Sequence, residues 1–199
     1  FIVNVHASTE LERTLNNLKD AFELPGMSAR YYQDQKLVES ANVGIRKVGY
    51  STPIQKHDKF HLGSCAKSMT ATIAAIAVER GYLKWDSLLT ELLPNISIHK
   101  DYENVTFDML LAHRSGLQRD IENFEQGWLY NVLESGLYTP TQARELVAKK
   151  LLVKKASYVP GSKYSYSNIG YMIAGYIIEK QFSLSFENIV ETHLFNPLK

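Results

Sequence analysis

Apolar residues near the N-terminus recur at the spacing of a helix that buries one face. A sequence with this spacing predicts an amphipathic helix over residues 10–23. Thr9 followed three residues later by Glu12 is typical of a capping box at its start, and Pro25-Gly26 is a suitable end. The apolar positions that share the face are Leu11, Leu15, Leu18 and Phe22.

Two strand-like stretches follow this helix. Residues 27–33 and 37–45 are joined by Asp34-Gln35, which predicts a β-hairpin. A short extended stretch is predicted over residues 59–62. An isolated two-stranded hairpin is marginally stable in water, so this one either packs on the helices or lacks further strands.

The most informative pattern covers residues 64–80. It is apolar on nearly all sides, which is typical of a buried central helix, and Gly81 suits a left-handed cap at its end. Further helices are predicted from caps or helical periodicity. They cover residues 86–93, 106–113, 140–152, 168–181 and 185–196. The predicted fold class is therefore mixed α+β, with a helix and hairpin followed by a mostly helical region.

Composition and charge exclude several classes of protein. Hydrophobic residues make up 45% of the 199 residues and charged residues 22%, which is ordinary for a globular chain and argues against disorder. The net charge of +1 gives no electrostatic reason to expect nucleic acid. No apolar run approaches the roughly 20 residues of a membrane-spanning helix. The single cysteine, Cys65, fits a cytoplasmic or a secreted protein, so the localisation is left open.

Ser64 and Lys67 are the first candidates for chemistry. They lie three residues apart at the start of the central helix, so their side chains share one face. A serine hydroxyl is a weak nucleophile until a nearby base takes its proton. The positive end of the helix and burial both favour a neutral lysine, which could act as that base. Ser–Lys pairs are a known variant of the catalytic triad.

Ser-x-x-Lys is a weak pattern by itself. Ser97-Ile98-His99-Lys100 repeats it in a polar stretch that we interpret as a solvated loop. The first copy differs because it opens an apolar helix, where a lysine is rarely buried without a partner. The alternative is that the helix end leaves Lys67 in water without a catalytic role.

Tyr166 and Asn168 are the second pair of candidates. They follow the turn Pro160-Gly161 and precede a predicted helix. A tyrosine beside Lys67 could relay a proton, and an asparagine amide could bind both the lysine and a substrate carbonyl. The alternative is a packed tyrosine ring and an asparagine that caps the helix. Tyr102-Glu103-Asn104 shows how easily the same pattern arises.

Three segments, in this order, resemble the serine β-lactamase-like and penicillin-binding family. They are residues 60–71 with the Ser-x-x-Lys pair, residues 105–117, and residues 160–175 with the Tyr-x-Asn pair. The likeness is to class C β-lactamases, DD-peptidases and related esterases, and it covers about residue 24 to the C-terminus. It implies the N-terminal portion of that fold in one truncated domain. Residues 1–63 would belong to the sheet lobe and residues 64–199 to the helical lobe.

The resemblance implies a serine hydrolase that acts on an amide or ester through an acyl-serine intermediate. The substrate would be a β-lactam, a D-alanyl peptide or a small ester, with no metal or organic cofactor. Ser64 would form the acyl-enzyme, Lys67 would assist its deprotonation, Tyr166 would relay protons and Asn168 would position Lys67 and the substrate. Which of Lys67 and Tyr166 is the base is left open. His113 matches a position that we interpret as structural.

The family's third motif, Lys-Thr-Gly or His-x-Gly on a late strand, is absent from these residues. In the family that strand supplies the second oxyanion donor, so we expect a missing C-terminal half to complete the site. Without it, these residues alone should be weakly active or inactive. The hairpin should leave a sheet edge exposed, which would allow self-association. The alternative function is a non-catalytic fragment or family member that binds peptides or partners on the same scaffold.

Overall fold

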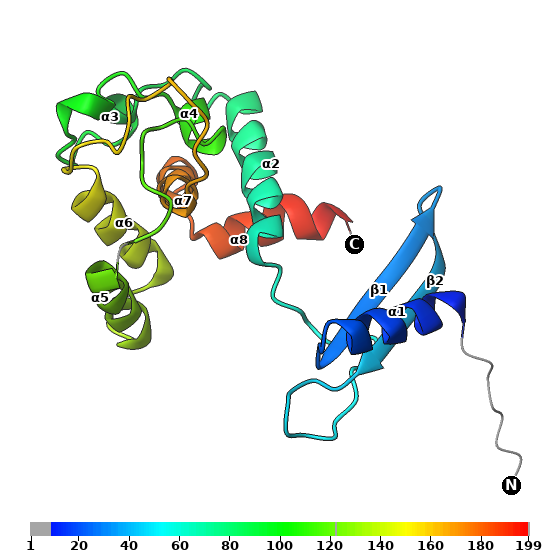
Figure 1. Cartoon of the computed structure of the whole chain (residues 1–199). Helices are drawn as coiled ribbons and strands as arrows, with labels where there is room; N and C mark the ends of the chain where they lie inside the picture. The colour runs from blue at the N-terminus through cyan, green and yellow to red at the C-terminus, as the bar shows by residue number, and fades with distance from the viewer. Residues whose placement is uncertain (1–8, 122, 199) are drawn as a thin grey trace, which may run out of the picture. The chain divides into compact units, whose positions relative to one another are not determined.

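The chain forms two compact units, Phe1–His61 and Leu62–Lys199, which we call unit 1 and unit 2. The structure is a computed structural model that describes residues 9–121 and 123–198 (Figure 1). Unit 1 holds a helix and a β-hairpin, and unit 2 is helical. This confirms the mixed α+β class predicted from the sequence. The assignment of residues 1–63 and 64–199 to a sheet lobe and a helical lobe stays a prediction.

Unit 1 begins with α1 (Glu10–Ala21), followed by β1 (Gly26–Gln33) and β2 (Lys36–Gly44). The backbone N–H of Glu12 donates to Thr9 Oγ1 at 3.2 Å, so Thr9 caps α1 as its sequence predicts. The two strands pair antiparallel. Both residues of the turn between them, Asp34 and Gln35, have positive φ angles, which is the conformation of the favoured two-residue hairpin turns.

The core of unit 1 is small. Helix α1 packs on one face of the hairpin, where Leu15, Ala41 and Val43 are buried. On the remaining surface of the hairpin, Tyr31 is 51% exposed and Leu37 44% exposed. Within the described residues the sheet has only these two strands. The predicted extended stretch over residues 59–62 has no regular secondary structure.

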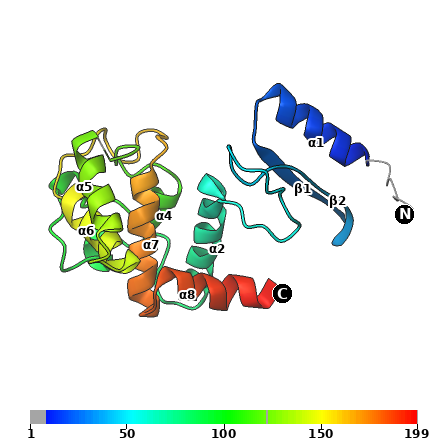
Figure 2. The same ribbon diagram turned by 90° about the horizontal axis from the view of Figure 1, so that it is seen from below.

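Unit 2 is built around one central helix, α7 (Asn168–Phe182). Helices α2, α4, α6 and α8 all contact α7, which the two views in Figures 1 and 2 show between α2 and α6. The helical elements of this unit are η1 (Gly63–Cys65), α2 (Ala66–Glu79), α3 (Leu89–Leu92), η2 (Lys100–Tyr102), α4 (Phe107–Leu111), α5 (Asn123–Glu134), α6 (Pro140–Leu151), α7, α8 (Phe186–Val190), the π-helical η3 (Glu191–Phe195) and η4 (Asn196–Leu198).

Helix α7 supplies much of the core of unit 2. Ile169, Ile173 and Ile177 are at most 1% exposed, and each such side chain contributes about 1.5–3 kcal/mol by leaving water. Helix α7 approaches α4 closely at Gly170, since a Cβ there would lie 3.3 Å from the carbonyl oxygen of Leu110, which is a tight contact. This close packing fixes the start of α7, where Asn168 lies.

Two helical predictions need correction. The helix predicted over residues 64–80 begins as the 3-10 turn η1, and α2 follows from Ala66. The expectation that it is buried on nearly all sides is wrong, because Ile73 and Ala74 are buried while Thr72 and Ala75 are exposed. Helix α5 was not predicted at all. Gly81 has a φ of 72°, the left-handed end that the sequence predicts.

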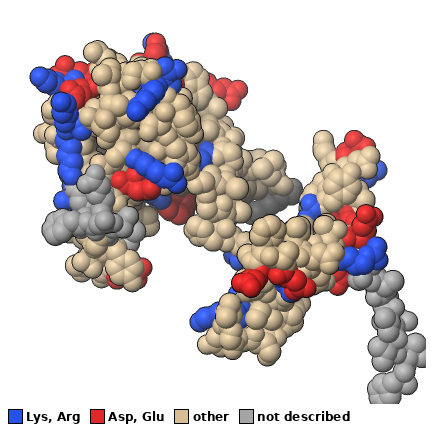
Figure 3. All heavy atoms as spheres, viewed as in Figure 1, with Lys and Arg blue, Asp and Glu red and all other residues tan. Residues whose placement is uncertain are grey.

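Charges of both signs are interspersed on the visible face of each unit in Figure 3. On the face seen in Figure 3, basic and acidic side chains occur in each unit without a large region of one sign. Among the described residues, no helix is long and apolar enough to span a membrane.

Candidate active site

Ser64 and Lys67 lie where η1 passes into α2. Gly63 has a φ of 53°, a left-handed conformation that favours glycine and turns the chain into η1. The backbone N–H of Cys65 donates to the carbonyl of Leu62 at 3.1 Å and closes this turn. Ser64 is exposed and Lys67 is half-buried. The hydroxyl is therefore open to solvent, while the amine lies closer to the body of unit 2.

Tyr166 and Asn168 lie at the start of α7. Between them, Ser167 caps the helix, accepting from the N–H of Gly170 at 3.0 Å. The hydroxyl of Ser167 also donates to the carbonyl of Gln118 at 2.7 Å. Because Ser167 is fully buried and bonded on both sides, the residues before and after it are held in place.

The four candidate side chains come together in unit 2. Ser64 Oγ lies 2.6 Å from the phenolic oxygen of Tyr166. Lys67 Nζ donates to Ser64 Oγ at 3.3 Å and to Asn168 Oδ1 at 2.6 Å. The same ammonium lies 5.0 Å from the centre of the Tyr166 ring. A serine hydroxyl is thus held between an amine and a phenol, which is a geometry suited to removal of its proton.

The charges around Tyr166 favour its ionised form. Hydrogen bonding to Lys67, and then to Ser64, lowers the pKa of Tyr166 below its ordinary value. The positive charges of Lys67 and Arg119 act in the same direction. The guanidinium of Arg119 lies 5.4 Å from the ring centre. A larger fraction of this phenol is therefore ionised at neutral pH than of an isolated tyrosine, and only the ionised form can accept a proton.

The ring of His113 packs against the ring of Tyr166. Its ring centre lies 4.5 Å from that of Tyr166 and 5.1 Å from that of Tyr171. Its Nδ1 accepts the backbone N–H of Ser167 at 3.0 Å. Burial, and then the charge of Lys67, lowers the pKa of His113, which keeps the ring neutral and able to accept. These contacts are with the tyrosine rings and a backbone group, which agrees with the structural interpretation of His113.

The structure adds two residues that were not singled out from the sequence, Arg119 and Asp120. Asp120 Oδ1 accepts from Asn168 Nδ2 at 2.5 Å, and Arg119 lies over Tyr166. They lie two and three residues after the family-like segment over residues 105–117. Their closeness to that segment was the one sign in the sequence that they could belong to the site. The sequence does not show which residues a loop contacts.

The second copies of the Ser-x-x-Lys and Tyr-x-Asn patterns, at Ser97 and Tyr102, have surroundings that differ from those of the candidate site. Ser97 lies exposed in irregular chain, as expected for a solvated loop. Tyr102 is only 2% exposed, and this burial raises its pKa to about 12. A tyrosine with so high a pKa is a poor proton acceptor at neutral pH, in contrast to Tyr166.

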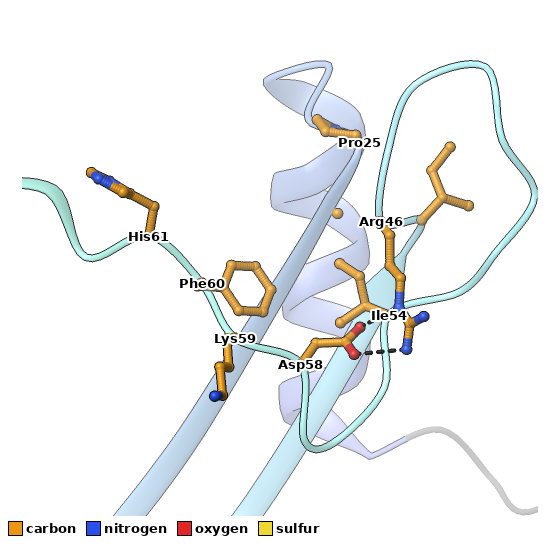
Figure 4. A pocket seen from close by; sticks show the side chains of 9 residues that line it. Pro25, Arg46, Ile54, Asp58, Lys59, Phe60 and His61 are labelled. Atoms are coloured by element: carbon orange, nitrogen blue, oxygen red, sulfur yellow. Dashed lines mark hydrogen bonds and ion pairs between the residues drawn. The ribbon is translucent and has the colours of Figure 1, made fainter. Parts of the chain in front are cut away.

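No metal site is found in the described part of the chain, in the sense that no group of three or more His, Cys, Asp or Glu side chains could hold an ion. A separate pocket of about 500 Å³ lies within unit 1 (Figure 4). Arg46 crosses it to pair with Asp58, at 2.7 Å for each of two hydrogen bonds. None of the four candidate side chains lines this pocket, so we place the candidate chemistry at Ser64 instead.

Comparison with known proteins gives one family. The profile named Beta-lactamase matches residues 11–199. Penicillin-binding protein 4 of Amycolatopsis lactamdurans is 28% identical over 184 residues, which are 91% of this chain and 45% of that protein. A β-lactamase of Yersinia enterocolitica is 23% identical over 203 residues, or 100% of this chain and 47% of that protein. The chain spans less than half the length of both relatives.

Solved structures show the same fold. The octameric penicillin-binding protein homologue of Pyrococcus abyssi superposes with a TM-score of 0.77 at 26% identity, over 95% of this chain and 42% of that one. The D-alanine carboxypeptidase AmpC of Burkholderia cenocepacia superposes with a TM-score of 0.71 at 24% identity, over 94% of this chain and 46% of that one. The mixed α+β arrangement of this chain therefore corresponds to part of the fold of these two proteins.

Proposed function

Because this chain belongs to the β-lactamase family, we propose that it carries the nucleophile of a serine hydrolase and that Ser64 forms the acyl intermediate. The observation that supports this most strongly is the position of Ser64 Oγ. It lies 2.6 Å from the phenolic oxygen of Tyr166 and 3.3 Å from Lys67 Nζ. One hydroxyl near the start of a helix is thus contacted by both a phenol and an amine.

In the proposed reaction, Ser64 Oγ attacks the carbonyl carbon of an amide or ester. Its proton passes to the phenolate of Tyr166, or to Lys67 in its neutral form, as the new C–O bond forms. The bond to the leaving group then breaks, and the stored proton passes to the departing nitrogen or oxygen. Water hydrolyses the acyl-serine in a second cycle through the same groups. The shorter distance and the lowered pKa favour Tyr166 as the first acceptor.

Lys67 and Asn168 are assigned supporting roles. The ammonium of Lys67 stabilises a Tyr166 phenolate, because both its hydrogen bonding and its charge lower the pKa of that phenol. Asn168 Oδ1 accepts from Lys67 at 2.6 Å and so holds the amine toward Ser64. The backbone N–H of Ser64 is proposed as one donor to the oxyanion.

The substrate class is an amide or ester with an exposed carbonyl. A β-lactam or a D-alanyl peptide is supported by relatives named as penicillin-binding proteins, a β-lactamase and a D-alanine carboxypeptidase. A small ester shares the same chemistry and stays an alternative substrate. We also propose that the activity belongs to the intact protein, and that the exposed hairpin of unit 1 pairs with further strands or with a second copy.

Covalent labelling tests the proposal. The intact protein is incubated with a fluorescent penicillin and, separately, with a fluorophosphonate probe, and fluorescence is followed on a denaturing gel. We expect labelling by at least one probe, its loss in Ser64→Ala, and its retention in the control Ser97→Ala. Labelling that survives Ser64→Ala would defeat the assignment. Binding of a peptide or penicillin without any covalent label would support the non-catalytic alternative instead.

A further inference from the structure

The loop over residues 118–120 is fastened to the start of α7 by three hydrogen bonds. The carbonyl of Gln118 accepts from Ser167 Oγ at 2.7 Å. The carbonyl of Arg119 accepts from the backbone N–H of Asn168 at 2.8 Å. The side chain of Asp120 accepts from Asn168 Nδ2 at 2.5 Å. Two of these bonds hold backbone or capping groups, whereas the third holds a side chain of the candidate site.

The amide of Asn168 has two different neighbours. Its oxygen accepts from the Lys67 ammonium at 2.6 Å, and its NH₂ group donates to the Asp120 carboxylate at 2.5 Å. If the amide were turned over, NH₂ would face the ammonium and oxygen would face the carboxylate. Both contacts would then be repulsive, because an ammonium only donates and a carboxylate only accepts. Asp120 therefore selects the orientation in which Asn168 can hold Lys67.

The second oxygen of Asp120 acts on the other side of the site. Asp120 Oδ2 accepts from Arg119 Nε at 3.1 Å, and the Arg119 guanidinium lies 5.4 Å from the centre of the Tyr166 ring. Arg119 and Asp120 are 73% and 47% exposed, so their ion pair alone contributes little stability. The Asp120 carboxylate instead places two side chains of the site. It binds Asn168, which contacts Lys67, and it binds Arg119, which lies over Tyr166.

We propose that Asp120 is a positioning residue, which orients the Asn168 amide so that Lys67 is held against Ser64. This inference rests on the proposed acyl-serine function for its kinetic consequence only. Asp120 does not contact Ser64 and is not itself a proton carrier in the reaction. Its loss should slow acylation of Ser64 while leaving the fold intact.

The kinetic test compares acylation rates of Ser64 by the fluorophosphonate probe in the intact protein. Asp120→Ala should acylate about 10-fold more slowly, as expected for loss of a hydrogen bond to a charged group. Asp120→Asn should lose less, because its amide oxygen can still accept from Asn168. Asp108→Ala is the control, since Asp108 is another exposed aspartate of unit 2, and its carboxylate accepts from the side chain of Thr106 rather than from Asn168 and Arg119. Rates within twofold of wild type in Asp120→Ala would overturn the proposal.

A double-mutant cycle separates positioning from a general structural role. Asp120→Ala should cost much less in an Asn168→Ala background than in wild type, because Asp120 acts mainly through that amide and only its contact with Arg119 remains. An equal loss in both backgrounds would contradict the proposal. If Asn168→Ala already falls below detection, the ranking of Asp120→Ala, Asp120→Asn and wild type decides in its place.

A measurement without activity distinguishes failure of this inference from failure of the proposed function. The side-chain NH₂ resonances of Asn168 are followed by NMR in wild type and Asp120→Ala. We expect slowed hydrogen exchange of this group in wild type and faster exchange in the variant. Unchanged exchange would overturn the positioning role even if Ser64 is acylated. If exchange is faster in Asp120→Ala but neither probe labels the protein, Asp120 orients Asn168 and the proposed hydrolase function is refuted.

Discussion

The hydroxyl oxygen of Ser64 lies 2.6 Å from the phenolic oxygen of Tyr166, although 102 positions separate the two residues. The contact follows from the packing of helices, because α2 begins just after Ser64, α7 begins just after Tyr166, and the two helices contact each other. Ser167, buried between Tyr166 and Asn168, holds the start of α7. The geometry of the candidate site is thus determined by the core of unit 2.

Replacing Tyr166 with Phe removes the hydroxyl and keeps the ring, so it tests the role of the hydroxyl alone. The ring contact with His113 stays, while the hydrogen bonding of the hydroxyl to Ser64 and Lys67 is lost. We expect acylation of Ser64 to fall by about 100-fold or more, the usual effect of removing a proton carrier, with an unchanged melting temperature. Acylation rates and thermal melts check this. Tyr164→Phe is the control, because Tyr164 also packs on His113 and should keep the full rate. Equal rates in the two variants would remove Tyr166 from the mechanism.

Arg119→Gln should change the pH dependence of acylation. The groups near Tyr166 include Ser64, Lys67, His113, Tyr171 and Arg119, and the last carries a positive charge that lowers the pKa of the phenol. Removing that charge raises the pKa of Tyr166. If its phenolate accepts the proton of Ser64, the rate rises with pH through this pKa, so the acidic limb moves to higher pH.

The pH profile of the acylation rate measures this shift. Arg119→Lys keeps the charge and should keep the wild-type limb. High salt should reduce the difference between Arg119→Gln and wild type, because Arg119 is exposed and its field is screened. A limb that moves to lower pH, or does not move, would speak against Tyr166 as the proton acceptor.

The sequence predicts the elements with strong local signals. The Thr9 cap of α1, the Asp34-Gln35 turn and the left-handed Gly81 are recovered because each is determined by a few adjacent residues. Helix α5 (Asn123–Glu134) lacked such a signal, since Gly127 lies inside it and no cap or clear periodicity stands out. The one-sided burial of α2 depends on which helices pack against it, which hydrophobicity alone does not specify.

The residues of the candidate site also differ in how well the sequence alone predicts that they lie together. Ser64 and Lys67 are close because they share one helical turn, and the sequence can show this. The approach of Tyr166 and Asn168 was expected only from the resemblance to a family. Asp120 was missed because its contact with Asn168 joins a loop to a helix start 48 positions away. No local pattern encodes such a contact.

His113 should make stability depend on pH. Burial and the charge of Lys67 lower its pKa in the folded chain, whereas in the unfolded chain it has the ordinary value of about 6.5. The unfolded state then binds a proton at a pH where folded His113 stays neutral. Its contribution is therefore complete above about pH 6.5 and declines as the pH falls toward the lowered value.

Urea unfolding of wild type and His113→Asn between pH 8 and pH 5 measures this contribution. Asparagine tolerates the positive φ of 57° at this position and can accept from the N–H of Ser167 without titrating. The stability difference between the two proteins should shrink or reverse as the pH falls, even though His193 titrates in both. A difference that is constant with pH would show that His113 does not titrate as described.

Arg144 should be essential for the stability of unit 2. Its guanidinium pairs at 2.6 Å with Glu179, whose side chain is only 1% exposed. The same carboxylate oxygen, Oε1, accepts from Thr141 Oγ1 and from the N–H of Phe186, while Oε2 is buried without a hydrogen-bond partner in the described part of the chain. Removing Arg144 would leave this carboxylate buried without its cation.

We expect Arg144→Ala to lower the free energy of unfolding by about 3 kcal/mol, the low end for breaking a buried ion pair. Lys149→Ala is the matched control, since its ion pair with Glu145 is partly exposed and should contribute about 0.5 kcal/mol. Chemical denaturation of both variants provides the comparison. Similar losses in the two would contradict the distinction between buried and exposed pairs drawn here.

We propose above that Ser64 is a nucleophile activated by its contacts with Lys67 and Tyr166. The most direct measurement is the rate at which a β-lactam or activated ester acylates the intact protein, with the adduct located by peptide mass spectrometry. We expect an acyl group on Ser64 and a rate about 1,000-fold lower in Lys67→Met, within the usual range for losing acid–base assistance. An adduct on another residue, or a Lys67→Met rate equal to that of wild type, would contradict it.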